Sequence, residues 1–225
     1  MFNIFNRRKP IKFYHPELKP GERIEKVLLE FILPELEPLG FRFLKSELCF
    51  VRTNGDFVNV ISIQKNKWNG GNDVCAFKPY LTIYSSELPK YLGISKTKKK
   101  IWFLGDSAED IDGWIDKYFD NYYNLAAHDN FDLIESFKHI LLNVGISYFN
   151  NYTTHNDVVN HYILNTVRSS IAPSLFDLCQ MKKDKVGATA VISWFEELSE
   201  NPTKKANQET LKEIDLRKDK LNNWL

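Results

Sequence analysis

Residues 40–84 read GFRFLKSELCFVRTNGDFVNVISIQKNKWNGGNDVCAFKPYLTIY, and they carry the clearest secondary-structure signals in the chain. The pair Asn54-Gly55 lies between two runs rich in apolar residues, which is the strongest short-range signal for a two-residue β-hairpin loop. This loop would place Leu48 opposite Ile61 in two strands that are apolar on both faces, as in strands covered on both sides. The segment from Cys75 to Tyr84 predicts a third strand.

Helical patterns lie on both sides of this segment. The residues from Gly21 to Leu39 have apolar side chains at i, i+3, i+4 and i+7, the spacing of one buried helix face. A broad apolar and aromatic stripe predicts a helix over residues 107–122. Further helices are predicted near 134–148, 156–168, 174–184, 187–199 and 204–223. We therefore predict an α+β fold, in which an antiparallel sheet of about four to five strands packs against helices and is followed by a helical C-terminal region.

The predicted domain organisation has three parts. Residues 1–20 contain three prolines and several basic side chains, and they predict an irregular basic arm. Residues 21–150 form the predicted α+β domain. Residues 151–225 form a predicted helical extension that packs on the same domain.

Composition narrows the class of protein. A chain of 225 residues that is 43% hydrophobic is typical of a folded globular protein. No apolar run approaches the roughly 20 residues that span a bilayer, and the N-terminal residues lack the order of a secretory signal. Three widely spaced cysteines favour a reducing compartment. We therefore expect a cytoplasmic protein that does not associate with a membrane.

Charge is unevenly distributed along the chain. The net charge is +1, but residues 1–104 contain 18 Lys and Arg against 10 Asp and Glu, a net charge of +8, whereas the remainder carries −7. The simplest interpretation is that a basic half and an acidic half attract each other across an internal packing surface. The alternative is that one of them binds a partner of opposite charge.

Several short motifs occur in a characteristic order. They are Leu36-Glu-Pro-Leu-Gly40-Phe41, Phe50-Val-Arg52, Val58-x-Val60-x-x-Ile63-Gln64-Lys65, the loop at Trp68, the strand from Phe77 to Tyr84 and Asp110-x-x-x-Trp114. Over about residues 22–125 this order resembles the bacterial domain-of-unknown-function family 4304. The chain has Asn66-Lys67 where that family often has a serine, and a longer helical C-terminus. The resemblance implies a bacterial α+β protein and carries over no catalytic or ligand-binding residue.

Two basic segments are candidates for contact with a partner. Trp68 lies between two lysines and the Asn69-Gly70-Gly71-Asn72 turn, a setting that suits a protein hot spot or the stacking of a nucleic-acid base. The alternative is that Trp68 folds back on the edge of the sheet. The run Lys96–Lys100 could bind phosphate groups or simply form a solvated loop.

Acidic residues in the predicted helix over 107–122 are a third candidate. Most of them favour a helix N-terminus through the helix dipole, and the surplus could form an acidic surface for a basic partner. The candidate partner-contact residues are Lys65, Lys67, Trp68, Asn69, Asn72, Lys98, Lys99, Asp112, Asp116 and Asp120.

Motifs for catalysis, cofactors and metals are weak or missing in the sequence. Gly70-Gly71 lacks the surroundings of a phosphate-binding loop, and the chain contains no GxSxG or HExxH motif. His155 and His161, with Asp157, do not have the i, i+4 spacing that puts two metal ligands on one helix face. We predict no catalytic residue, no metal site and no cofactor, while separated residues could still assemble an active site.

These observations predict a function without chemistry. The first hypothesis is a non-catalytic cytoplasmic protein-interaction module, with a toxin-neutralising immunity protein as one concrete form. The alternative is a nucleic-acid-binding protein that uses the Trp68 loop and the Lys96–Lys100 run.

Overall fold

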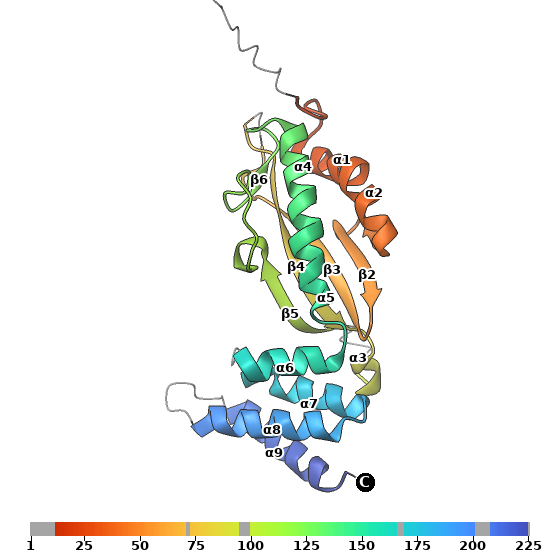
Figure 1. The fold of residues 1–225 in the computed structure, drawn as a ribbon, viewed down its shortest axis with the longest axis vertical. Coiled ribbons are helices and arrows are strands. Elements are labelled where there is room, and N and C mark those ends of the chain that lie inside the picture. The colour runs from red at the N-terminus through yellow and green to blue at the C-terminus, as the bar shows by residue number, and fades with distance from the viewer. Residues whose placement is uncertain (1–11, 71–72, 95–99, 166–168, 201–207, 225) are drawn as a thin grey trace, which may run out of the picture. The chain divides into compact units, whose positions relative to one another are not determined.

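The computed structural model describes residues 12–70, 73–94, 100–165, 169–200 and 208–224, and it has an α+β fold with a helical C-terminal region (Figure 1). The antiparallel sheet consists of β1 (Arg42–Leu44), β2 (Cys49–Asn54), β3 (Phe57–Lys65), β4 (Ala76–Ser85), β5 (Ile101–Ser107) and β6 (Tyr123–Asn124). The strand order is β1-β2-β3-β4-β5, and β6 pairs with β4. The predicted fold class is therefore confirmed.

The hairpin between β2 and β3 forms one residue later than the sequence predicted. The strands end at Asn54 and resume at Phe57, so the loop is Gly55-Asp56, with φ +59° at Gly55. A glycine with positive φ at the first loop position is typical of a type II′ turn. Leu48 consequently pairs with Ile63, whose N–H donates to the Leu48 carbonyl oxygen at 3.0 Å. Because the shift is two residues on β3, each side chain keeps its predicted face.

The predicted N-terminal helix is present but is not a uniform α-helix. It comprises α1 (Pro20–Val27), a π-helical segment (Leu28–Ile32), α2 (Leu33–Leu36) and a final 3₁₀ turn that ends at Gly40, which has φ +83°. Pro34 has no N–H to donate to the preceding turn, and the wider π-helical turn just before it accommodates that loss.

The prediction of a helix over residues 107–122 is wrong. Ala108–Asp110 form a single 3₁₀ turn, and the chain then runs through turns to β6. Gly113 and Asn121 adopt positive φ angles of 81° and 60°, which end any helical path, and Ile115 is 88% exposed. The aromatic spacing in this segment therefore reflects a loop that packs through some of its rings.

The chain divides into two compact units. The first contains Val60–Leu81, Asp106–Tyr148 and the described part of Met1–Arg52. Its helices are α1, α2, α4 (Asn130–Ile140) and α5 (Ile146–Asn150), with a π-helical segment at Leu141–Gly145 between the last two. The ring of Phe137 on α4 lies 5.5 Å from that of Phe77 and 4.8 Å from that of Tyr123. These contacts pack α4 on the sheet, beside α1 and α2 (Figure 1).

The second unit contains Thr53–Asn59 and the described parts of Thr82–Gly105 and Phe149–Leu225. Its helices are α3 (Leu88–Tyr91), α6 (His155–Asn165), α7 (Ala172–Met181), α8 (Lys185–Glu200) and α9 (Gln208–Asn222). Five residues of α7 and α8 that share an apolar core are buried, namely Leu175, Phe176, Val191, Trp194 and Phe195. On α7, the Asp177 carboxylate accepts hydrogen bonds from Arg217 of α9 at 3.0 and 2.5 Å.

Two further properties bear on function. Cys49, Cys75 and Cys179 are all free thiols and buried. In the part of the chain that the structure describes, no helix has both the length and the apolar character required to cross a membrane.

Candidate functional site

The loop that follows β3 is fastened to the start of β4 by amide side chains. Asn69 Nδ2 donates to the Ala76 carbonyl oxygen at 2.8 Å, and Asn69 Oδ1 accepts from the Ala76 N–H at 2.7 Å. The Asn66 N–H donates to the same carbonyl oxygen at 2.9 Å. The Asn69 side-chain amide thus forms the same pair of hydrogen bonds with Ala76 that the backbone of a neighbouring strand would form. Both of its polar atoms are therefore bonded within the protein. We had predicted Asn69 as a contact residue; its hydrogen bonds suit a positioning role.

Trp68 projects from this fastened loop. The backbone N–H of Trp68 donates to Asn66 Oδ1 at 2.8 Å, which is the hydrogen bond between residues i and i+2 of an Asx turn. The Trp68 side chain is 72% exposed. Lys67 Nζ lies 5.0 Å from the centre of the indole ring, within the range of a cation–π contact. The indole is therefore held at the surface and does not fold back on the sheet. We did not predict a structural role for Asn66, although an asparagine at the start of a turn indicates an Asx turn.

The remaining candidates on the two basic segments differ in their surroundings. Lys65 is exposed at the end of β3, and a Cβ added to Gly21 would lie 3.3 Å from Lys65 Nζ. Asn72, Lys98 and Lys99 lie outside the described residues. Lys100, the last residue of the basic run, has its Nζ 4.9 Å from the Tyr84 ring and 5.5 Å from the Trp102 ring.

The acidic candidates do not form a helical surface. Asp112 and Asp120 are exposed in the loop before β6, whereas Asp116 accepts internal hydrogen bonds. Its Oδ1 accepts from the Tyr118 N–H and from Ser136 Oγ, both at 2.9 Å, and its Oδ2 accepts from Tyr123 Oη at 2.9 Å. Asp116 is thus engaged in holding the loop. The three carboxylates were predicted to share one surface, and the loss of the predicted helix removes that arrangement.

Burial and the Asp116 carboxylate affect the acidity of Tyr123. The Tyr123 side chain is fully buried and its hydroxyl accepts from Trp114 Nε1 at 3.2 Å. Burial and the neighbouring negative charge of Asp116 both raise the pKa of Tyr123 above its usual value. The phenol therefore stays protonated and serves as a donor to Asp116.

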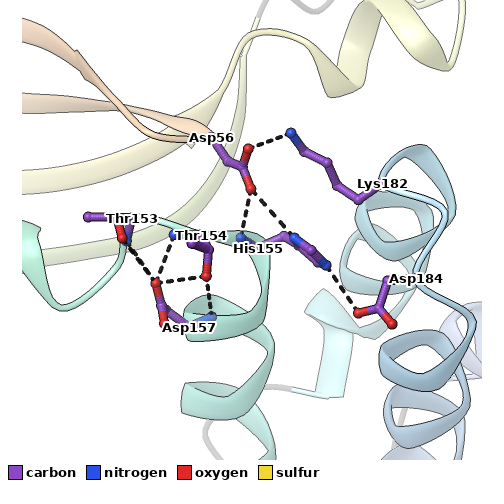
Figure 2. A network of polar contacts seen from close by, with 7 residues as sticks. All are labelled: Asp56, Thr153, Thr154, His155, Asp157, Lys182 and Asp184. Atoms are coloured by element: carbon purple, nitrogen blue, oxygen red, sulfur yellow. Dashed lines mark hydrogen bonds and ion pairs between the residues drawn. The ribbon is translucent and has the colours of Figure 1, made fainter.

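In the second unit, a polar network surrounds His155 at the start of α6 (Figure 2). The His155 N–H donates to Asp56 Oδ2 at 2.9 Å, and the ring Nε2 lies 3.1 Å from Asp184 Oδ2. Lys182 Nζ pairs with the other oxygen of Asp56. Burial of the Asp56 carboxylate opposes ionisation, but the hydrogen bonds from Lys182 and the His155 N–H outweigh it and lower the pKa of Asp56. The network fastens the hairpin loop to the start of α6.

The candidate metal ligands His155, His161 and Asp157 form hydrogen bonds with different groups. Asp157 Oδ2 accepts from the N–H groups of Thr153 and Thr154 at 3.0 and 2.8 Å and so caps α6. His161 Nδ1 lies 2.9 Å from Tyr152 Oη. Across the described ranges, no group of three or more His, Cys, Asp or Glu side chains is arranged to hold a metal ion. His155, Asp157 and His161 therefore stabilise the start of α6 through different contacts.

The thiol nearest to this network is not activated. Burial, reinforced by the negative charge of Asp184, raises the pKa of Cys179 to about 12. A thiol with this pKa is protonated at neutral pH and is a poor nucleophile.

Comparisons with known proteins assign no role to either site. No family model, curated protein or solved structure matches the chain.

Proposed function

We propose that the protein is a non-catalytic, cytoplasmic protein-interaction module whose contact surface is the Trp68 loop, residues Lys65–Gly70. The observation that carries this proposal is a tryptophan that is 72% exposed on a loop fixed by hydrogen bonds of Asn66 and Asn69. A tryptophan supplies a large contact area at a small cost in side-chain entropy, and it is among the residues enriched at binding hot spots.

The chemistry of the loop indicates the kind of partner. Lys65 and Lys67 are both exposed on this segment, and Lys67 Nζ lies 5.0 Å from the centre of the indole ring, so the loop presents positive charge next to an apolar ring. A complementary protein surface has an apolar pocket for the indole and carboxylates at the rim of that pocket. A toxin with such a surface, neutralised by this chain, is one concrete form of the proposal. Membership in family 4304 is compatible with it and remains a prediction.

The test is a pull-down from native lysate with the tagged full chain and two variants. Trp68→Ala removes the indole from the loop, and Trp102→Ala removes a tryptophan that is 47% exposed elsewhere. Loss of a hot spot of about 2 kcal/mol weakens binding about 30-fold, so a stoichiometric protein should be recovered with wild type and Trp102→Ala but not with Trp68→Ala. Recovery of no stoichiometric protein, or equal recovery with all three, contradicts the proposal.

A second candidate function is the binding of nucleic acid. It is supported by a second aromatic and basic group, in which Lys100 lies over the rings of Tyr84 and Trp102. Tyr84 is buried, whereas the Trp102 ring is 47% exposed, and an exposed aromatic ring beside a lysine suits base stacking together with a phosphate contact. Electrophoretic mobility at low and high salt tests it: binding should fall steeply with salt and weaken in Lys67→Ala. No binding at low salt removes this candidate.

A further inference from the structure

The first unit contains a cavity at the start of α1, apart from the Trp68 side chain. The cavity has a volume of about 540 Å³, and its lining includes the polar residues Lys19, Arg23 and Cys75 and the apolar residues Phe13, Leu18 and Pro20. Its volume falls within the roughly 300–1,000 Å³ of small-molecule sites. The cavity therefore has the size and the mixed lining of a ligand site.

Arg23 is a buried cation that forms no ion pair with an acidic side chain in the described part of the chain. It is 6% exposed, and its Nε donates to the Tyr14 carbonyl oxygen at 2.8 Å. Its Nη2 donates to the Leu125 carbonyl oxygen at 3.0 Å and to Asn130 Oδ1 at 2.9 Å. All of these acceptors are neutral, and no carboxylate of the described residues forms an ion pair with the guanidinium. The N–H groups of Nη1 have no partner among the described residues.

A buried charge that lacks a counter-ion is costly. Removing an ionised group from water is unfavourable unless an opposite charge and hydrogen bonds compensate for the lost hydration. Here the hydrogen bonds hold the guanidinium in one orientation at the wall of a cavity, while its positive charge remains uncompensated. An anion in the cavity would supply the missing counter-charge, and a planar guanidinium is well suited to carboxylate and phosphate groups.

The surroundings of Arg23 add positive potential. Lys19, at the rim of the cavity, is the N-cap of α1 and makes no side-chain capping bond, so the cavity faces an uncapped helix N-terminus. Lys65 Nζ lies close to Gly21 in the first turn of the same helix. The acidic lining residue, Glu17, is 67% exposed and lies 3.9 Å from His15. Its charge is therefore largely hydrated.

The thiol of Cys75 does not oppose an anion. Burial raises the pKa of Cys75, so the thiol stays neutral at physiological pH. Its Sγ donates to the Pro20 carbonyl oxygen at 3.6 Å. The cavity thus presents the Arg23 charge beside apolar surface from Phe13, Leu18 and Pro20, with Glu17 and Lys19 also in its lining.

We propose that this cavity binds a small organic anion, with its carboxylate or phosphate group held by Arg23 and its apolar part packed against Phe13 and Leu18. The site does not include the Trp68 indole that carries the proposed function, and Lys65, which lies near both, is unchanged in either test, so either proposal can fail without the other. Arg23 stands four residues before Val27 and so shares the buried face of α1, but this spacing does not by itself indicate a cavity.

The experiment uses the ¹⁵N-labelled full chain titrated with inorganic phosphate and, separately, with benzoate, at constant ionic strength maintained with chloride. Either probe should shift the Arg23 Nε–H resonance in a saturable manner and raise the melting temperature. A response to phosphate alone assigns a phosphate group to the ligand, and a response to benzoate alone assigns a carboxylate. An unchanged Nε–H resonance with both probes overturns the proposal.

Variants on α1 provide the control. Lys19→Ala, at the exposed rim, should weaken the binding of the responding probe about two- to fivefold, whereas Lys26→Ala on the same helix should leave it unchanged. Arg23→Met should abolish the rise in melting temperature caused by the responding probe if the variant folds, and Lys19→Ala keeps the test decisive if it does not. Equal affinity in wild type, Lys19→Ala and Lys26→Ala contradicts the proposed location of the anion.

Discussion

Gly55 and Gly93 both adopt positive φ but have different surroundings. Their φ angles are +59° and +69°, so an alanine at either position would be strained to a similar degree. A Cβ added at Gly55 would lie 2.0 Å from the Thr153 carbonyl oxygen, whereas one added at Gly93 meets nothing within 4 Å. The two residues therefore separate the cost of backbone strain from the cost of a steric clash.

We predict that Gly55→Ala destabilises the protein more than Gly93→Ala. In Gly93→Ala, the backbone strain of an alanine at positive φ should by itself lower the free energy of unfolding by about 1–2 kcal/mol. Gly55→Ala should lose about 2 kcal/mol more, because the hairpin loop must move away from Thr153 and its contacts. Urea unfolding at neutral pH measures both values. Equal losses would show that the loop is not held against Thr153.

A second prediction at this scale concerns Asp116. Asp116→Ala removes the carboxylate that accepts hydrogen bonds from the Tyr118 N–H, the Tyr123 hydroxyl and the Ser136 hydroxyl. The buried Tyr123 hydroxyl then loses this hydrogen-bond acceptor. The free energy of unfolding should fall by about 2–4 kcal/mol. Asp112→Ala, in the same loop and exposed, should change it by less than about 0.5 kcal/mol. Similar effects of the two variants in urea unfolding would contradict the assigned role of Asp116.

Individual residues show where sequence reasoning reached its limit. The exposure of Trp68 follows from local features, namely flanking lysines and a turn. Asp116 was predicted as a surface carboxylate because its partner Ser136 is far away in sequence, and only the fold brings the two side chains together. For the same reason the sequence did not reveal the cavity at Arg23, whose acceptors Leu125 and Asn130 come from a distant segment.

At the scale of elements, tertiary contacts changed two predictions. Asn54-Gly55 is a good type I′ loop by itself, but the Asp56 N–H donates to the Thr153 carbonyl oxygen at 2.9 Å, which favours the loop Gly55-Asp56. The segment 107–122 has a helical apolar period, yet its rings pack from a loop, since Asp116 competes for backbone N–H groups. The strands β2, β3 and β4 were predictable because their apolar patterns were sufficient.

The hairpin loop also makes stability depend on pH. The pKa of Asp56 is lowered in the folded protein from its usual 3.8, so in acid the unfolded chain binds more protons at this group. Its contribution to stability is therefore complete above the unfolded pKa and is lost as the pH falls through the folded pKa. We predict that Asp56→Asn lowers the free energy of unfolding at pH 7 and flattens its decline below about pH 4.

The measurement is urea unfolding of wild type and Asp56→Asn between pH 7 and pH 2. Asp112→Asn, whose side chain is exposed, should follow the wild-type profile. Parallel profiles for wild type and Asp56→Asn would mean that Asp56 titrates alike in both states.

At the scale of the whole molecule, the second unit is assembled from separate parts of the chain. Tyr162 Oη donates to the Phe103 carbonyl oxygen, and the His155 N–H donates to Asp56. The C-terminal helices thus donate hydrogen bonds to segments that precede them by many residues. The sequence predicted a helical extension over residues 151–225 that packs on the same domain, and these hydrogen bonds are the contacts that the helices make with earlier segments.

We predict that a fragment of residues 149–225 is less stable than the same helices in the full chain. It retains the ion pair between Asp177 and Arg217 but loses the contacts with Phe103 and Asp56. Circular dichroism should show reduced helicity and a lower urea midpoint. A cooperative transition at the midpoint of the full chain would demonstrate that the helices fold independently.

The strand order β1-β2-β3-β4-β5 has a consequence for how the protein is made. Each of these strands pairs with its predecessor in the chain, so the ribbon can grow in the order of synthesis on the ribosome. Among the strands that the structure describes, only β6 must return to an earlier strand, β4. During synthesis, few strand edges should therefore remain unpaired until a distant segment is made. This shortens the time in which an exposed edge can aggregate.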